Sequence, residues 1–157
     1  MDLKVTEVTE TSAFHVGMHM KDVDRREAFL STGLSPLRAL QESISISDIC
    51  KIVRVRLTGL PIAVLGRATI DEPGILKIGV PWCVTTDDVP RYAKSFMQGA
   101  PHWVKYLQGD CDLLMNFCLP ENKTTILWLK KVGFEFSDTP MPYGVQRVPF
   151  LKFWRYK

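Results

Sequence analysis

The chain has 157 residues, a formal net charge of +3, 46% hydrophobic and 24% charged residues. This length suits one domain with a sizeable core, so we expect a single domain over residues 1–157. Nucleic-acid-binding proteins usually have a concentrated basic face, and a net charge this small does not indicate one. Nucleic acid is therefore not expected as the primary ligand. Because no apolar run reaches the roughly 18 residues of a membrane span, and the first ten residues have no signal-peptide core, we expect no membrane segment.

The N-terminal part of the chain predicts a short strand followed by helices. Each helix follows a residue whose side chain can accept hydrogen bonds from free N–H groups: Ser12, then Asp22 or Asp24, then Ser35. Gly33 can end the second helix in a left-handed conformation. The predicted elements are a strand at Leu3–Val8 and helices at Ala13–Met20, Arg25–Leu30 and Pro36–Ser45.

Three β-rich runs follow, and a turn signal separates each from the next. The turns are predicted at Thr58-Gly59 and Asp71–Gly74, where glycine supplies the backbone freedom that a turn needs. Because short turns join strands in opposite directions, we expect an antiparallel meander. Its strands are predicted at Ile52–Leu57, Ile62–Ile70 and Ile75–Val84.

From Thr85 onward the pattern alternates between helices and strands. A helical stretch runs to about Leu107, and Gly99-Ala100-Pro101 is expected to break or restart it, because proline lacks a backbone N–H. The apolar run Leu113–Leu119, interrupted only by Asn116, is typical of a buried central strand. The remaining elements are a helix at Asn122–Val132, a strand through Phe134 and Phe136, an irregular loop at Thr139–Gly144 and a strand at Val148–Tyr156. This order predicts an α/β fold around one sheet.

The segment Leu113–Phe136, LLMNFCLPENKTTILWLKKVGFEF, resembles the C-terminal signature of the GNAT acyltransferase fold. In that family the last helix often opens with Asn and closes with Gly-Phe, and Asn122 and Gly133-Phe134 occupy those places here. The resemblance implies an α/β (α+β) fold with a mixed, mostly antiparallel sheet and helices on both faces. The alternative is that Asn122 is only a helix cap and Gly133 only a helix stop. The positions that carry the signature are Asn116, Asn122, Leu129, Gly133 and Phe134.

Three segments also resemble a family of short-tailed phage (podovirus) proteins, in which a GNAT-like domain is identified as an internal virion or morphogenesis protein. They are MKDVDRREAFLSTGLSPLRALQESI (Met20–Ile44), IGVPWCVTTDDV (Ile78–Val89) and LMNFCLPENKTTILWLKKVGFEF (Leu114–Phe136). This resemblance implies a structural role in the particle and a location in the virion or the host cytoplasm.

The resemblance to GNAT enzymes implies a glycine-rich loop after the third meander strand, whose N–H groups hold the diphosphate of coenzyme A. The corresponding segment is Thr85-Thr86-Asp87-Asp88-Val89-Pro90. It has no glycine, Pro90 removes one donor, and two carboxylates would repel the phosphates. We interpret Asp87 and Asp88 as helix-capping residues instead, and predict no bound cofactor.

The same resemblance places a tyrosine on the last helix, where it protonates the departing thiolate. Counting back from Gly133, that place is held by Leu129, which has no proton to give. The adjacent Trp128 has an indole N–H that is a donor and not an acid. Tyrosines elsewhere in the chain could substitute, although no spacing argument favours one of them: Tyr92, Tyr106 and Tyr143.

Metal and thiol chemistry have little support in the sequence. Cys50, Cys83 and Cys118 lie in apolar runs typical of buried free thiols, and no cysteine has a zinc-ligand spacing. His15 and His19 lie one helical turn apart but have no carboxylate at matching spacing, so we predict no metal site.

These observations favour a non-catalytic virion structural or assembly protein on a degenerate GNAT fold. It would bind other phage virion or assembly proteins through the Met141–Tyr143 loop and apolar residues of the last strand, namely Phe150, Phe153, Trp154 and Tyr156. The alternative is an acyl-CoA-dependent N-acetyltransferase with an atypical cofactor loop, which would use acetyl-CoA. A third possibility is a protein that binds a host factor.

Overall fold

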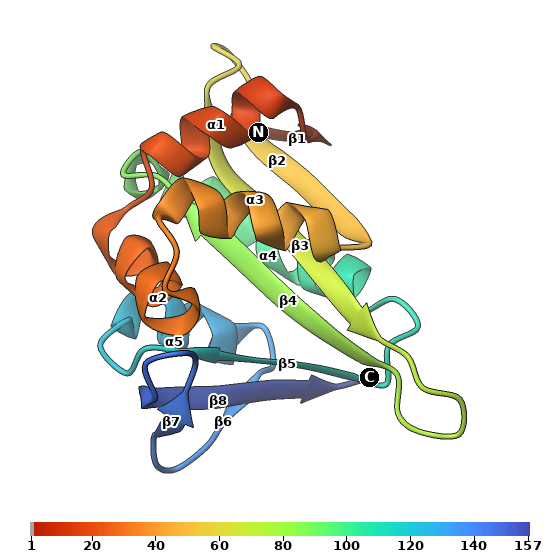
Figure 1. Cartoon of the computed structure of the whole chain (residues 1–157). Coiled ribbons are helices and arrows are strands. Elements are labelled where there is room, and N and C mark those ends of the chain that lie inside the picture. The colour runs from red at the N-terminus through yellow and green to blue at the C-terminus, as the bar shows by residue number, and fades with distance from the viewer. Residues whose placement is uncertain (1) are drawn as a thin grey trace.

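The computed structural model describes residues 2–157 and shows one mixed sheet with helices on both faces (Figure 1). The strand order is β1-β2-β3-β4-β5-β8-β6, and β7 pairs with β8 beside this path. Neighbouring strands are antiparallel except for β4 and β5, which are parallel. The strands are β1 (Leu3–Glu7), β2 (Ile49–Val55), β3 (Pro61–Ile70), β4 (Ile78–Thr85), β5 (Leu113–Cys118), β6 (Glu135–Phe136), β7 (Met141–Tyr143) and β8 (Val148–Tyr156).

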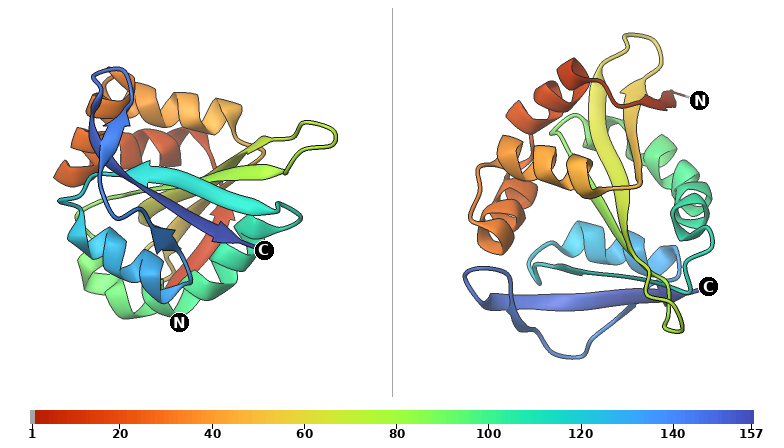
Figure 2. Two further views of the ribbon diagram at one scale, coloured as in Figure 1. Left: turned by 90° about the horizontal axis from the view of Figure 1, so that it is seen from below. Right: turned by 45° about the vertical axis from the view of Figure 1, so that its right-hand side comes forward.

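The helices form two layers, with α1 and α3 on one face of the sheet and α4 and α5 on the other (Figure 2). α2 lies at the side of the sheet where β4 and β5 end (Figure 1). Within residues 2–157, no helix is long and apolar enough to cross a membrane. The helices are α1 (Glu10–Met18), α2 (Asp22–Thr32), α3 (Pro36–Ile46), the 3₁₀ helix η1 (Val89–Tyr92), α4 (Ala93–Gln108) and α5 (Lys123–Lys131).

Both faces of the sheet are packed with apolar side chains. In β3, Val64 belongs to the core beneath α1 and α3, whereas Ala63 and Leu65 belong to the core beneath α4 and α5. Successive strand residues point to opposite faces, so a β3 that is buried on both faces is apolar almost continuously.

Several predictions from local sequence are confirmed. The meander β2–β3–β4 is antiparallel, and β8 has the predicted bounds. The Ser35 hydroxyl accepts from the N–H of Arg38 at 3.3 Å and caps α3. Gly33 and Gly133 follow α2 and α5 with φ of 74° and 95°, conformations that side chains with a Cβ disfavour.

Other predicted boundaries are wrong. α1 begins at Glu10, because Thr9 is its cap and Ser12 completes a capping box from within the helix. Neither predicted aspartate caps α2, whose N-cap residue is Lys21. α4 continues through Pro101, since one missing N–H is tolerated in a helix held by an apolar face. The predicted loop near Met141–Tyr143 contains β7, which pairs with β8.

Candidate active site

β4 and β5 are parallel neighbours that pair along only part of their length. Cα pairing joins Ile78 to Leu113 and Gly79 to Leu114. Beyond these residues β4 stays paired with β3, whereas β5 stays paired with β8. The two strands therefore diverge, as the V between them in Figure 1 shows. We call the paired start of these strands the closed end, and their diverging C-terminal ends the open end.

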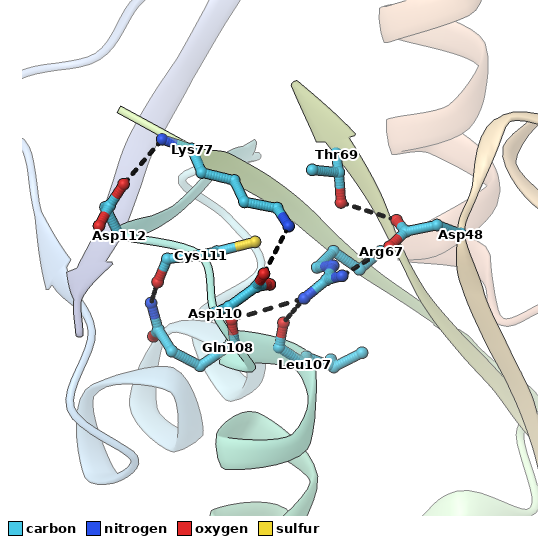
Figure 3. A network of polar contacts seen from close by, with 9 residues as sticks. All are labelled: Asp48, Arg67, Thr69, Lys77, Leu107, Gln108, Asp110, Cys111 and Asp112. Carbon is cyan, nitrogen blue, oxygen red and sulfur yellow. Dashed lines mark hydrogen bonds and ion pairs between the residues drawn. The ribbon is translucent and has the colours of Figure 1, made fainter. Parts of the chain in front are cut away.

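Polar contacts around Arg67 of β3 hold the closed end together (Figure 3). Arg67 is only 5% exposed; its Nη1 donates to the carbonyl of Leu107 at 2.6 Å, and its Nη2 donates to the carboxylate of Asp48. Lys77 forms an ion pair with Asp110 at 2.7 Å. These bonds connect β3 and the end of α4 to the segments that precede β2, β4 and β5, so the start of the V is fixed from several sides.

Gly79 is the last residue of β4 that pairs with β5. A Cβ at this position would lie 2.6 Å from Leu114 Cδ2 and 2.8 Å from Arg67 Cδ. Atoms in a packed protein do not approach so closely, so any larger residue here would have to displace the Leu114 or Arg67 side chain at the point where the strands meet.

Asn116 of β5 forms a side-chain connection where the backbone pairing stops. Its Nδ2 donates to the carbonyl of Pro81 on β4 at 2.7 Å, and its Oδ1 accepts from the N–H of Phe117 at 2.8 Å. The Asn116 amide therefore satisfies one backbone group on each diverging strand. It spans a distance that direct backbone hydrogen bonds no longer bridge.

Beyond this connection, the backbone N–H and C=O of Cys83 in β4 face the gap. Thr86 N donates to Ile62 O, so the backbone N–H and C=O groups of the even-numbered residues of β4 face β3. Pro81 O and Thr85 N instead bond groups on the opposite side. Because strand peptide groups alternate with a period of two, the N–H and C=O of Cys83 also face away from β3. β5 no longer pairs with β4 at this level, so this edge can accept an extended ligand.

Two carboxylates of α2 lie across the open end. Asp24 and Glu27 are three residues apart and share one face of the helix. Asp24 Oδ2 accepts from the N–H and hydroxyl of Thr85 at 2.9 and 2.8 Å. Glu27 Oε1 accepts from Leu119 N at 2.9 Å and from Asn122 Nδ2 at 3.0 Å. α2 therefore ties the end of β4 to the segment after β5.

Burial changes the acidity of both carboxyl groups. Loss of hydration raises the pKa of Glu27 to about 7, even though the hydrogen bonds from Asn122 and Leu119 act in the opposite direction. Burial also raises the pKa of Asp24. The hydrogen bonds from Asn122 and Leu119 both end on Glu27 Oε1, and within residues 2–157 no hydrogen bond ends on Oε2, so one oxygen is available to a ligand. A carboxylate that ionises near pH 7 is suited to general base catalysis.

A cavity of about 1060 Å³ connects these groups. Its wall is mostly apolar and includes residues of both helical layers, so the cavity reaches the gap from both faces of the sheet. A pocket of this size with a few convergent polar groups is typical of a small-molecule site. The residues of its wall that bear on chemistry are Asp24, Glu27, Cys83, Asn116, Trp128 and Tyr143.

The predicted cofactor loop, Thr85–Pro90, leads from β4 into η1. Asp88 is the N-cap residue of η1 but makes no side-chain capping bond, so the interpretation of Asp88 as a helix cap is wrong. Asn122 likewise makes no capping bond at α5. Its side chain donates to Glu27 instead, which gives this signature residue a place in the candidate site.

The structure also places the positions predicted for a proton donor. Leu129 is 5% exposed; it packs in the core beneath α5 and also lines the cavity. Among the substitute tyrosines, Tyr143 lines the cavity and stacks on Phe117 with ring centroids 4.0 Å apart, whereas Tyr92 and Tyr106 are not among its lining residues. Burial raises the pKa of Tyr143, so its hydroxyl stays protonated at neutral pH.

Phe150 and Phe153 were predicted to form a contact surface, and this is wrong because they are 1% and 6% exposed and lie in the interior. His15 and His19 stack with ring centroids 4.3 Å apart. Within residues 2–157, no three His, Cys, Asp or Glu side chains converge as metal ligands would.

Sequence reasoning missed Asp24 and Glu27 as site residues. Their partners Thr85 and Leu119 are 61 and 92 positions away in the chain. One signal was present: the first half of α2 is rich in charged residues, and the residue that the helix buries is Asp24. A helix that buries an aspartate rather than a leucine has a specific reason to do so, because an unpaired buried charge is costly.

No model of a known protein family and no curated protein matches the chain. Solved structures do resemble it. The NatC complex bound to Gag peptide and CoA has a TM-score of 0.73 at 14% identity, covering 100% of this chain and 99% of that chain. The aminoglycoside N(6')acetyltransferase from Legionella pneumophila has a TM-score of 0.70 at 12% identity, with coverage of 99% and 92%. The acetyltransferase of GNAT family from Streptococcus pneumoniae has a TM-score of 0.61 at 11% identity, with coverage of 99% and 99%.

These likenesses overturn the prediction of a non-catalytic virion structural protein, and with it the virion location. The similar structures are acetyltransferases, and none of the three is a phage virion protein. They support the alternative better than the main prediction. The predicted fold class is confirmed: the chain has the GNAT acetyltransferase fold.

Proposed function

We propose that the protein transfers an acyl group from a pantetheine-type thioester to an amine. The observation that carries this proposal is Glu27, a residue of the cavity wall at the open end of the β4–β5 gap, whose carboxyl group has a pKa of about 7 and hydrogen bonds through one oxygen only. An amine attacks a thioester only after it loses a proton, and a base of this strength accepts that proton at neutral pH.

The gap itself suits the other substrate. A pantetheine arm carries amide groups along an extended chain, and the unpaired edge of β4 offers the C=O of Cys83 to an amide N–H of such a chain. The structure of NatC was solved with CoA, and NatC shares this architecture. The arm would lie between the strands, with its thioester directed toward α2.

The reaction is a single displacement at the thioester carbonyl. The amine nitrogen forms a bond to the carbonyl carbon, the C–S bond breaks, and the electron pair of that bond leaves with sulfur. Glu27 takes the proton from nitrogen. The N–H of Cys83, which faces the gap, is placed to stabilise the oxyanion that develops at the carbonyl oxygen.

A covalent acyl-cysteine intermediate is disfavoured by the acidity of the nearby thiols. Burial raises the pKa of Cys83 and of Cys118 to about 12. Since the thiolate is the nucleophile, both cysteines are almost entirely unreactive at neutral pH. Direct attack by the amine therefore fits the site better than a two-step transfer. Tyr143, with its raised pKa, is the candidate that returns a proton to the leaving sulfur.

An acyl-transfer assay tests the proposal. Purified protein is incubated with acetyl-CoA and S-acetyl-pantetheine, each against primary amines of several classes: polyamines, aminoglycosides and peptide N-termini. Mass spectrometry then detects the acetylated amine. We expect product with the native protein and with Asp22→Asn, an exposed acid of the same helix, but not with Glu27→Gln. Absence of acetylated product from every amine with both donors would overturn the proposal.

A further inference from the structure

We infer that the donor is recognised through its acyl-pantetheine arm alone, and that the nucleotide part of coenzyme A adds little to binding. This inference rests on the proposed function and specifies its donor. It depends on the difference between two parts of the same binding region: the β4–β5 gap, which suits the arm, and the loop at Thr85–Pro90, which does not suit a diphosphate.

The loop uses most of its backbone donors internally. Asp88 N donates to Thr86 Oγ1 and Val89 N donates to Thr86 O, both at 3.3 Å. Arg91 N donates to Asp88 O at 3.1 Å, and Pro90 has no N–H. A phosphate-binding loop needs several unpaired N–H groups that converge on the anion. The turn that leads into η1 has already used most of the donors at this position.

The charge of the loop acts in the same direction. Asp87 is exposed, and Asp88 lies close enough to His15 to influence its pKa. Like charges about 4 Å apart repel by about 1 kcal/mol in bulk water and by more beside a protein. The nearby cations, Arg91 in the sequence and Arg25 in the small cavity beside the loop, do not exceed the two carboxylates in number. A diphosphate gains neither hydrogen bonds nor favourable charge from this loop.

Arg25 does not compensate for the missing donors. It lines a small cavity beside the loop, together with Asp87 and Asp88. However, its guanidinium donates to the carbonyls of Met20 and Met18 at 2.6 and 2.9 Å, which directs it at the turn between α1 and α2. The arm, by contrast, keeps its place at the free edge of β4. The protein therefore recognises the same acyl-pantetheine arm in three kinds of donor. The arm can be attached to a carrier protein, attached to a nucleotide as in acyl-CoA, or free.

Binding measurements separate the two parts of the donor without requiring the acceptor. Calorimetry or ligand-observed NMR compares CoA, pantetheine and adenosine 3′,5′-diphosphate on the full chain. We expect dissociation constants for CoA and pantetheine within about threefold of each other, and no competition by adenosine 3′,5′-diphosphate. A CoA affinity more than about thirtyfold above that of pantetheine, or competition by the nucleotide, would overturn the inference while leaving acyl transfer intact. Binding of neither CoA nor pantetheine would instead refute the proposed function together with its donor.

A pair of matched variants tests the cause. Asp87→Asn/Asp88→Asn should tighten CoA binding and leave pantetheine binding unchanged, because only CoA carries the diphosphate. Asp71→Asn/Glu72→Gln removes the same charge from the turn between β3 and β4 and should change neither. Equal effects of both double variants would overturn the assignment to the loop. Transfer rates with acetyl-pantetheine, acetyl-CoA and an acetylated carrier protein then show which source of the arm is used best.

Discussion

The two ends of the β4–β5 pair are built from the same kinds of residue but are suited to opposite tasks. At the closed end, Arg67 is buried and its charge is matched by Asp48 and by a backbone carbonyl. At the open end, Asp24 is buried and Glu27 is half-buried near it, and within residues 2–157 no cation forms a hydrogen bond with either carboxylate. Matched charges hold a structure in one arrangement, whereas unmatched carboxylates acquire the raised pKa that proton transfer requires.

The largest expected effect is at the open end. Replacement of Glu27 by Gln keeps the side-chain shape and the acceptor for Leu119 N, but removes the base. We expect the transfer rate to fall by about 10²–10⁴-fold, with the fold intact. The native rate should rise with pH through about 7 as Glu27 ionises, and this limb should vanish in the variant. An unchanged pH profile in the variant would assign the base to another group.

At the closed end the expected effect is on stability. Arg67→Leu removes a buried cation and leaves the carbonyl of Leu107 without its donor. Because the partner Asp48 is half exposed and can rehydrate, we expect a loss of about 3 kcal/mol in the free energy of unfolding. Urea denaturation measures it. Lys77→Met, which breaks the more exposed ion pair of the same region, should cost far less. Equal losses in both variants would mean that burial does not distinguish the two pairs.

Stability should also depend on pH in a way that only the open end explains. The pKa of Glu27 is about 7 in the folded protein and near its ordinary value of 4.5 when unfolded. Between these values the folded state holds more protons, so its stability falls as pH rises. We therefore compare the free energy of unfolding of Glu27→Gln with that of the native protein at two pH values. The difference should shift in favour of the variant by about 2 kcal/mol between pH 5 and pH 8. Thermal unfolding at both pH values tests this, and Asp22→Asn should show no such gain.

The boundary between the two ends is Asn116. Asn116→Ala leaves Pro81 O and Phe117 N without their side-chain partner, and we expect a loss of about 1–2 kcal/mol, because water can reach part of this site. Asn116→Asp retains an acceptor for Phe117 N but places a second oxygen against Pro81 O, so it should cost at least as much at pH 7. Urea denaturation of the two variants, combined with their pantetheine affinity, shows whether the connection sets the width of the gap. Wild-type stability and affinity in both variants would contradict this role.

Sequence reasoning succeeded where the signal is local. Ser35 caps a helix within three residues of itself, and Gly133 adopts its conformation because of its own missing Cβ. The β-rich run of β3 and the turn signals on either side of it were enough to predict the meander. Element order and the spacing from Asn122 to Gly133 were then enough for the fold class.

The candidate site depends on contacts that no local pattern encodes. Glu27 acquires its pKa only after α2 is placed against Leu119, which lies 92 residues further along the chain. The functional prediction failed for a related reason. It rested on two features that are visible in the sequence, the missing glycine-rich loop and the leucine at position 129. It did not include the two carboxylates that α2 places at the site.

The smallest expected effect concerns the proton that returns to sulfur. Tyr143→Phe keeps the stacking on Phe117 but removes the hydroxyl. We expect kcat to fall by about tenfold with KM unchanged, since a thiolate is a moderately good leaving group even without an acid. Tyr106→Phe, at a tyrosine outside the cavity wall, is the matched control and should leave kcat unchanged. If both variants keep the native kcat, water supplies this proton, and the chemistry of the open end then depends on the α2 carboxylates without a tyrosine.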